Sequence, residues 1–193
     1  HTDALYEALR RTTLTDLGTI SRDALCGRLC AHEQVLCVVN RRSTAQELFA
    51  ALPPDGSYCL TTLLCAADRR RQIREIRARL RDGLPCRVVS TSLIEAGVDV
   101  DFPAAYREQC GLDSLLQAAG RCNREGKRCA AESIIYRFCL EDAPAPAMLA
   151  KNISALAFAA RRAPDLASPQ AIEAYFSELY RICGERTLDK KGI

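Results

Sequence analysis

The sequence has little of what metal and disulfide sites require. Its two histidines are His1 and His32, and its eleven cysteines include no C-x-x-C pair, since Cys26 and Cys30, the nearest two, are four positions apart. A zinc site built from cysteine and histidine is therefore not expected. The cysteines are scattered and odd in number, which favours reduced, structural thiols in a cytosolic protein over the paired cysteines of a secreted one.

Long apolar runs and a secretory signal are also missing. The longest apolar stretches, such as VLCVV and CLTTLLCAA, are too short to cross a bilayer, and HTDALYEALRR at the start lacks the apolar stretch of a signal sequence. We therefore expect no membrane partner. The first residue is not methionine and the chain stops at LDKKGI, which predicts a piece of a longer protein.

Two parts of a nucleotide-hydrolysing site are absent. No G-x-x-x-x-G-K-[ST] loop is present to cradle phosphates, and no D-E-x-[DH] motif is present to hold a metal ion. His32-Glu33 is not the His-Asp pair of a metal-dependent nuclease. The carboxylates of Glu95, Asp99 and Asp101 lie close in sequence, but nothing else completes a metal site around them, so none is predicted.

What is present is an ordinary globular composition. The 193 residues, 48% hydrophobic and 26% charged, suffice for one domain with an appended piece. The formal net charge of +3 permits a local basic patch and excludes a globally basic protein.

Hydrophobic periodicity predicts strands that alternate with helices. The predicted strands are 12–18, 34–40, 57–64, 86–92, 104–108 and 132–139. The predicted helices are a weak one over 3–11, one from its N-cap Ser21 to Cys30, one over 44–52 with Ser43 as N-cap, one over 69–82 that stops at Gly83, and one over 113–121. This alternation is typical of an α/β fold, a doubly wound parallel sheet with helices on both faces.

The composition changes after Asp142. APAPA is a hinge, and the rest is helical, with one helix over 147–162 and another that Ser168 and Pro169 open. We therefore predict a domain over residues 1–142 and a C-terminal helical appendage over residues 143–193.

The first segment with chemical potential is VVSTSLIEAGVDVDF. Ligands gather at the carboxyl ends of strands in a doubly wound sheet, and Thr91, Ser92, Gly97 and Asp99 follow such an end. The hydroxyls suit a sugar-phosphate backbone, the glycine allows close approach, and the carboxylate can accept from a ribose hydroxyl. An ordinary turn at a strand end explains these residues equally well.

The second segment is DSLLQAAGRCNREG. Arg121 and Arg124 follow Gly120 and are three residues apart, so that on a helix end they project to one side. Guanidinium groups bind phosphate oxygens and stabilise the charge on a transferred phosphoryl group. Two solvated surface arginines are the alternative. Cys122 has no histidine near it in sequence to activate it, and it is not predicted to be a nucleophile.

The predicted helix over 69–82 is rich in arginine. Ile73, Ile76 and Leu80 form its buried stripe, and the outer face carries Arg70, Arg74, Arg77 and Arg81. Such a face could track a nucleic-acid backbone, but a charged, solvated face is the preferred interpretation, with Arg69 at the helix start excepted.

Taken in order, these segments resemble the second RecA-like domain of a superfamily-two helicase. VLCVVNRRSTAQELF resembles motif IV, VVSTSLIEAGVDVDF motif V and QAAGRCNREG motif VI. With EAGVDVDFPAAYRE, TTLLCAADRR, AIEAYFSELY and LDKKGI, the chain resembles the CRISPR-associated helicase-nuclease family of type I systems, in particular its subtype C branch. The resemblance covers most of residues 12–142 and, more loosely, the helical tail.

The resemblance implies a C-terminal motor domain of an ATP-dependent single-stranded DNA translocase. A metal-dependent nuclease domain and a first RecA-like domain would precede it, and ATP and Mg²⁺ would be bound mainly by that first RecA-like domain. An RNA-guided surveillance complex would recruit the whole protein, a monomeric motor in the prokaryotic cytoplasm. The chain alone would not hydrolyse ATP.

The resemblance also implies roles for individual residues. The catalytic set would be Arg121 and Arg124, one of them the arginine finger at the γ-phosphate, together with Gln117, which would couple nucleotide to DNA. The ATP-binding set would be Gly97, Asp99 and Gly120, and the DNA-binding set Asn40, Arg69, Thr91 and Ser92. The family usually has His-Arg where this chain has Asp68-Arg69, and an aspartate is a poor phosphate partner.

Two other interpretations stay open on the sequence. The chain could be the same domain of another superfamily-two helicase, for example one in DNA repair. It could also be a non-catalytic RecA-like module kept for protein docking.

Overall fold

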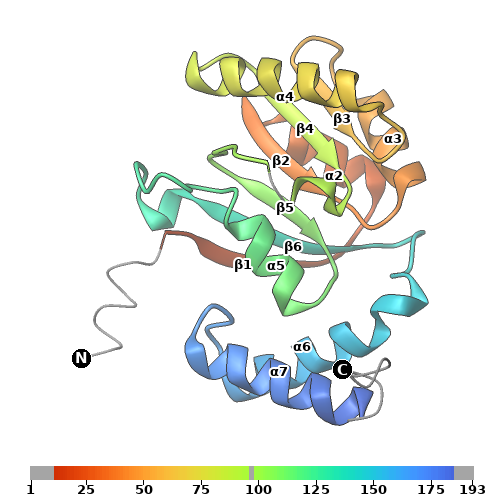
Figure 1. Ribbon diagram of the computed structural model, residues 1–193, viewed down its shortest axis with the longest axis vertical. Helices are drawn as coiled ribbons and strands as arrows, with labels where there is room; N and C mark the ends of the chain where they lie inside the picture. The colour runs from red at the N-terminus through yellow and green to blue at the C-terminus, as the bar shows by residue number, and fades with distance from the viewer. Residues whose placement is uncertain (1–10, 96–97, 185–193) are drawn as a thin grey trace.

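A computed structural model describes residues 11–95 and 98–184, and it contains one six-stranded parallel sheet in the order β1-β6-β5-β2-β4-β3 (Figure 1). The strands are β1 (Thr13–Ile20), β2 (Gln34–Val38), β3 (Ser57–Leu60), β4 (Cys86–Ser90), β5 (Ala105–Glu108) and β6 (Ile134–Leu140). All six predicted strands are confirmed, although three of them end two to four residues earlier than predicted. The predicted helix over 3–11 lies, except for its last residue, outside the described residues.

Helices cover both faces of the sheet, as predicted. The helices are α2 (Arg22–Cys30), α3 (Arg42–Ala51), α4 (Ala66–Arg81), α5 (Leu112–Ala119), α6 (Ala150–Arg162) and α7 (Pro169–Cys183). Central strand β2 shows the division, because successive side chains point to opposite faces. Val35 and Cys37 pack in the cluster with α2 and α3, whereas Leu36 and Val38 pack in the cluster with α4 and α5.

Of the four cysteines expected to be buried in strands, Cys37 and Cys86 are buried, whereas Cys59 and Cys139 are only partly buried. All eleven are free thiols, and four of them, Cys37, Cys86, Cys110 and Cys122, are buried. Burial raises the pKa of Cys86 and of Cys122 to about 12, which keeps both thiols protonated at neutral pH. These side chains therefore act as small hydrophobic residues.

The N-caps of the helices were predicted with mixed success. Ser21 and Ser168 each accept a hydrogen bond from the backbone three residues on, as predicted. The prediction for Ser43 is wrong: α3 begins at Arg42, and its N-cap Arg41 makes no side-chain cap. The chain turns early because Asn40 is already fixed to the next strand, its backbone N–H donating to the Glu108 carboxylate over 2.7 Å.

Helix α4 also begins earlier than predicted. Cys65 is its N-cap, and its Sγ accepts from the backbone N–H of Asp68 while the thiol donates to the Asp68 carboxylate over 3.2 Å. This exchange satisfies a free N–H of the first turn and extends the helix three residues toward the N-terminus. At the other end, Gly83 has a φ of +68° and ends the helix as predicted.

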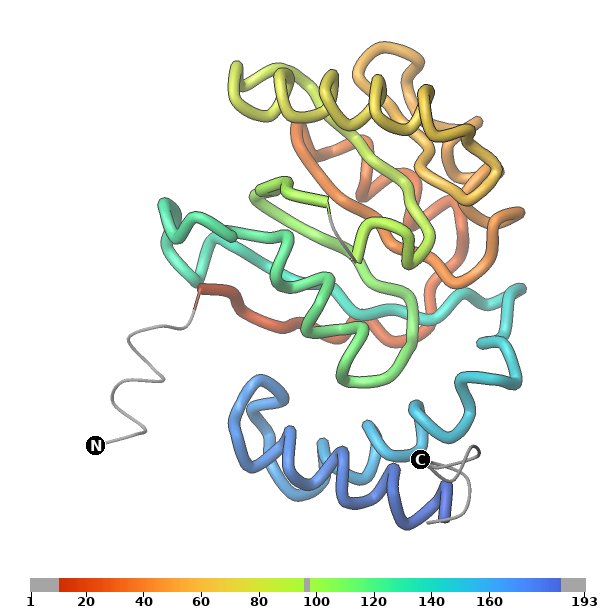
Figure 2. Tube along the Cα trace, viewed as in Figure 1, coloured from red at the N-terminus to blue at the C-terminus, as the bar shows by residue number. Residues whose placement is uncertain are grey.

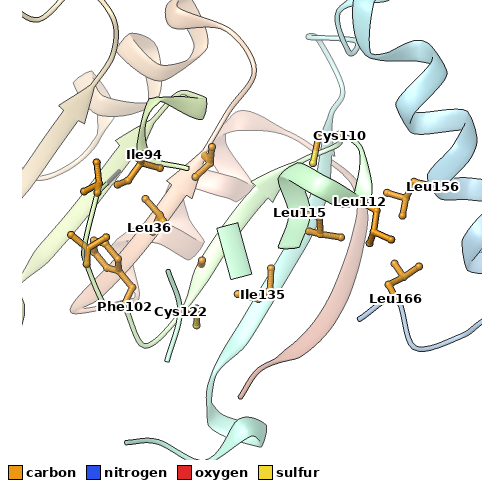
Figure 3. Packing of buried hydrophobic residues seen from close by; sticks show 14 of the residues in the cluster. Leu36, Ile94, Phe102, Cys110, Leu112, Leu115, Cys122, Ile135, Leu156 and Leu166 are labelled. Atoms are coloured by element: carbon orange, nitrogen blue, oxygen red, sulfur yellow. The ribbon is translucent and has the colours of Figure 1, made fainter. Parts of the chain in front are cut away.

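The C-terminal part is helical as predicted, and it packs on the sheet through α5. Figure 1 shows α6 and α7 side by side below α5. Leu156 and Leu166 belong to the same buried cluster as Leu112 and Leu115 of α5 (Figure 3). The proposed division at residue 142 stays a prediction.

A buried tyrosine fastens α7 to the start of α5. The Tyr175 hydroxyl donates to Asp113 Oδ1 over 2.7 Å and accepts from Asn152 Nδ2 over 3.0 Å. Gly111, which precedes α5, lies so close that a Cβ there would overlap this hydroxyl. Burial and the Asp113 carboxylate both raise the pKa of Tyr175, so that it remains a neutral donor.

We expect Tyr175→Phe to lower the free energy of unfolding by about 1–3 kcal/mol, because it leaves Asp113 and Asn152 without their shared partner. Chemical denaturation of the 193-residue chain measures the change. Tyr180→Phe is the matched control, because Tyr180 is 53% exposed and loses only a solvated hydroxyl. Equal stability of the two variants would contradict the anchoring role.

Candidate functional site

The candidate residues gather along the connection between β4 and β5. Because β2 lies between these two strands, the connection has to cross the sheet, and we call its described residues, 91–95 and 98–104, the crossover segment. Figure 2 shows the chain returning across the sheet between the two strands. Residues 96 and 97 lie outside the described residues, so the predicted role of Gly97 has no structural counterpart here. Ile94 and Phe102 pack beside Leu36 of β2 (Figure 3).

The loop after α5 is joined to the crossover segment by a short parallel bridge. The Phe102 N–H donates to the Arg121 carbonyl, and the Asn123 N–H donates to the Phe102 carbonyl, each over 2.9 Å. Between them, the buried Cys122 thiol donates to the Pro103 carbonyl over 3.3 Å. The two segments that the sequence singled out therefore form one unit, and Cys122 is part of its packing.

Arg121 is bound to the crossover segment through its guanidinium group. Its Nε donates to the Ile94 carbonyl over 3.1 Å, and its Nη2 donates to the Glu95 carbonyl over 2.6 Å. Burial, and then repulsion from Arg124, lower the pKa of Arg121, although an arginine keeps its charge in proteins. Arg121 is thus a restrained cation and not a solvated surface group.

Arg124 is held more loosely on the same segment. Its Nε lies 2.8 Å from the Asp99 carboxylate, in a pair whose side chains are 43% and 71% exposed. Its backbone N–H donates to Asp101 Oδ1 over 2.7 Å. Exposed ion pairs are worth only about 0–1 kcal/mol, so a phosphate can replace Asp99 as the partner of Arg124 at little cost.

Asn123, between the two arginines, is a structural residue that the sequence reasoning missed. It has a φ of +48° and is 1% exposed. Its Nδ2 donates to the carbonyls of Arg11 and Arg128 over 2.8 and 2.7 Å, and its Oδ1 accepts from the Arg128 N–H over 3.0 Å. Asparagine is one of the few residues that adopt this left-handed conformation routinely, which was the available signal.

A mostly basic open pocket of about 550 Å³ is lined in part by Arg124. Its charged lining comprises Arg77, Arg81, Arg124, Lys127 and Arg128 with Asp99, Asp101 and Glu125. Arg77 donates to the Asp99 carbonyl over 2.7 Å. The outer face of α4 is therefore not uniformly solvated, because Arg77 contacts the crossover segment.

Asn40, Thr91 and Ser92 follow the carboxyl ends of β2 and β4, and Arg69 lies in the first turn of α4, the helix that follows β3. A parallel sheet brings these strand ends to one edge. Ser92 is exposed, whereas Thr91 is 92% buried. Arg69 is half-buried, and its side chain has no hydrogen-bond or ion-pair partner among the described residues. Asn40 is engaged, its Nδ2 donating to the Gln109 carbonyl over 2.9 Å.

A buried charged cluster behind this edge was also missed. Arg107 Nε lies 3.0 Å from Glu95 Oε1, and these side chains are 3% and 5% exposed. Arg107 Nη1 donates to Asn40 Oδ1 over 2.8 Å. Burial raises the pKa of Glu95 and Arg107 opposes that shift, while burial raises the pKa of Glu108 against the Asn40 N–H that it accepts.

Asp68 has a local role. Its carboxylate accepts from the Cys65 thiol and from Arg71 Nη2 over 3.1 Å. These two donors lower the pKa of Asp68. An acidic residue at position 68 therefore stabilises the first turn of α4, where negative charge also suits the helix dipole.

The remaining predicted residues lie at the end of α5. Gln117 is exposed, and Gly120 is the exposed C-cap, with its N–H donating to the Leu116 carbonyl over 2.9 Å.

Over residues 11–95 and 98–184, no three histidine, cysteine, aspartate or glutamate side chains gather to hold a metal ion. In the same part of the chain, no helix has the length and apolarity needed to cross a membrane.

The chain is similar to known proteins of one family. The family model for "CRISPR-associated nuclease/helicase Cas3, C-terminal" matches residues 31–127. A Cas3 nuclease/helicase of Methanothermobacter thermautotrophicus is 35% identical over 95 residues, which make up 49% of this chain and 11% of that protein.

Solved structures share the fold as well. T. fusca Cas3-ATP superimposes with a TM-score of 0.64 and 17% identity, over 88% of this chain and 23% of that one. A CRISPR RNA-guided surveillance complex in its pre-nicking state contains a chain that superimposes with a TM-score of 0.64 and 16% identity, over 89% of this chain and 25% of that one. This chain therefore spans about a quarter or less of each of these relatives.

We expect Asn123→Ala to lower the free energy of unfolding by about 2–4 kcal/mol. It removes the three hydrogen bonds of the Asn123 side chain and leaves their main-chain partners unsatisfied, at about 1–3 kcal/mol. It also places alanine, which adopts the left-handed conformation less readily than asparagine, at a positive φ, at about 1 kcal/mol more. Asn123→Gly is the control, because it removes the same hydrogen bonds without the backbone strain. Chemical denaturation should rank wild type above Asn123→Gly above Asn123→Ala, and an Ala variant as stable as wild type would refute the assignment.

Proposed function

This chain belongs to the family of C-terminal domains of the CRISPR-associated nuclease/helicase Cas3, and from that premise we propose that it is the second motor domain of an ATP-dependent single-stranded DNA translocase. It would supply the arginines that act on a triphosphate and an edge that contacts DNA. The family match favours this assignment over the alternative interpretation, a motor domain of a DNA-repair helicase. The assignment to subtype C stays a prediction.

The observation that carries the proposal is the pair of arginines on the crossover segment. Arg121 and Arg124 both make their described side-chain bonds to that segment, one to carbonyls and one to a carboxylate. Two guanidinium groups on one support can bind phosphate oxygens and stabilise the charge that develops on a transferred phosphoryl group.

The two arginines differ in how readily they can reach a phosphate. Arg124 has only to leave an exposed ion pair, at about 0–1 kcal/mol. Arg121 has to leave two carbonyls, and hydrogen bonds to a charged group are worth about 1.5–3 kcal/mol each. We infer that Arg124 binds the phosphate first and that Arg121 acts after its release from the crossover segment.

The nucleotide and the metal fit this chain only in part. The arginines suit the phosphates of ATP, a nucleotide named with the T. fusca Cas3 relative. The Asp99 carboxylate is paired with Arg124, and the described residues hold no metal-binding cluster. We therefore assign Mg²⁺ and most ATP contacts to a first RecA-like domain, with Gly97, Asp99 and Gly120 lining the near side and Gln117 coupling nucleotide to DNA.

The partners follow from the same reasoning. Single-stranded DNA would lie along the carboxyl ends of β2, β3 and β4, where Ser92 and Arg69 have free polar groups. Thr91 is the least accessible of the proposed contacts, because its side chain is buried and its N–H and carbonyl are hydrogen-bonded within the protein. An RNA-guided surveillance complex is named with one structural relative, and we propose such a complex as the recruiting partner of the whole protein. We further propose a monomeric motor in the cytoplasm.

We expect Arg121→Ala and Arg124→Ala each to lower ATP hydrolysis by the full-length protein, by about three to five decades for the arginine finger. A steady-state phosphate-release assay with single-stranded DNA present measures the rates. Arg161→Ala is the control, because Arg161 is an exposed arginine at the end of α6.

The isolated 193-residue chain is expected to give no DNA-stimulated hydrolysis, so that it sets the background of this assay. Unchanged rates in both arginine variants would favour a non-catalytic docking module. Hydrolysis by the isolated chain would contradict the assignment of ATP binding to another domain.

We expect Arg69→Ala to weaken binding of single-stranded DNA by the full-length protein without changing its stability. Losing one phosphate contact reduces the slope of log K against log salt by about 0.7 for a single strand. Fluorescence anisotropy at several salt concentrations gives that slope. Arg70→Ala, which changes an exposed neighbour, is the control, and identical slopes for both variants and wild type would count against Arg69 as a contact.

A further inference from the structure

A continuous chain of polar contacts links the DNA-facing edge to the arginines. Arg107 Nη1 donates to Asn40 Oδ1 over 2.8 Å, and Arg107 Nε lies 3.0 Å from the Glu95 carboxylate. Glu95 then accepts from Arg121 Nη2 over 2.6 Å through its backbone carbonyl. Glu95 therefore faces Arg107 with its side chain and Arg121 with its main chain.

Burial makes this link stiff. The side chains of Arg107 and Glu95 are 3% and 5% exposed and form an ion pair, and the Glu95 carboxylate also has a side-chain hydrogen bond with Ser114. Two buried charges that depend on one another cannot separate without a large desolvation cost. A displacement of the Arg107 guanidinium therefore moves the Glu95 side chain with it.

The Asn40 end of the link is fixed as firmly. The Asn40 N–H donates to Glu108 over 2.7 Å and its Nδ2 donates to the Gln109 carbonyl over 2.9 Å. Arg107 Nη1 also donates to the Glu108 carbonyl over 3.1 Å. A ligand that hydrogen-bonds to the Asn40 side chain therefore competes with the hydrogen bond from Arg107 Nη1 to Asn40 Oδ1, which helps to set the position of Arg107.

We propose that Arg107 and Glu95 are positioning residues that couple DNA binding at Asn40 to the release of Arg121 from the crossover segment. The inference rests on the proposed function. DNA contact at Asn40 shifts the Arg107 guanidinium group, and the Glu95 carboxylate moves with it. The Glu95 backbone then shifts, and with it the carbonyls of Ile94 and Glu95 that restrain Arg121. The pair thus makes ATP hydrolysis depend on DNA without touching either ligand.

The test compares Arg107→Lys with Arg87→Lys in the full-length protein. A lysine at position 107 keeps the charge that compensates Glu95, but its single nitrogen lacks the fork that spans Glu95 and Asn40. Arg87 is the matched control, because it is another buried strand arginine, 8% exposed, whose Nη2 donates to the Cys30 carbonyl away from this link. ATP hydrolysis with and without saturating single-stranded DNA gives the stimulation ratio, and thermal unfolding gives the stability.

We expect Arg107→Lys to lower the stimulation ratio about fivefold or more, the lower bound of ordinary coupling between two sites. Arg87→Lys should retain the wild-type ratio. A purely structural role would lower the melting temperature of both variants while leaving the ratio unchanged, and that result would overturn the proposal. So would a ratio for Arg107→Lys within twofold of that for Arg87→Lys.

A second variant guards against misfolding. Glu95→Gln keeps the shape of the side chain and removes its charge, and we expect it to lower the ratio as Arg107→Lys does. Wild-type stimulation in Glu95→Gln would overturn the proposal whatever Arg107→Lys does. Arg121→Ala distinguishes failure of the proposed function from failure of the coupling proposal. If Arg121→Ala hydrolyses ATP at the wild-type rate, the proposed function fails. If Arg121→Ala is inactive but Arg107→Lys and Glu95→Gln keep the wild-type stimulation ratio, only the coupling proposal fails.

Discussion

The position of β2 between β4 and β5 is the constraint on which the candidate site depends. It requires the connection between β4 and β5 to cross over β2 before it can pair with the far side of that strand. The crossing chain covers Leu36 with Ile94 and Phe102 and presents free main-chain groups to the loop after α5. The Arg121 guanidinium donates to the carbonyls of Ile94 and Glu95 in this segment. The strand order therefore creates the main-chain surface that holds Arg121 in place.

Most of the fold could be predicted from periodicity. Buried parallel strands are short apolar runs in the sequence. In the arginine-rich helix, the helical spacing of the apolar residues, Ile76 among them, identifies the face that is buried. The errors lie at helix starts, where long-range contacts decide. Nothing local to Ser43 reports that Asn40 is already fixed by Glu108, and the thiol cap of Cys65 is a less familiar signal than a serine.

The candidate site was only half visible in the sequence. Arg121 and Arg124 stand out because their spacing is local and matches a motif. The cluster of Arg107, Glu95 and Asn40 joins three strand ends that are far apart in sequence, and charged residues in AAYRE read as an ordinary short strand. Asn123 was passed over for another reason: only its positive φ distinguishes it from a loop residue.

The close approach of Gly111 to Tyr175 constrains how this family can vary. A β-carbon at position 111 would overlap the Tyr175 hydroxyl, the Asp113 carboxylate and the Asn152 β-carbon, so all three residues of the anchor require glycine there. A larger residue at position 111 is therefore incompatible with this docking of the last helix, and shortening the tyrosine alone would not make room for it, because Asp113 and Asn152 stay in the way.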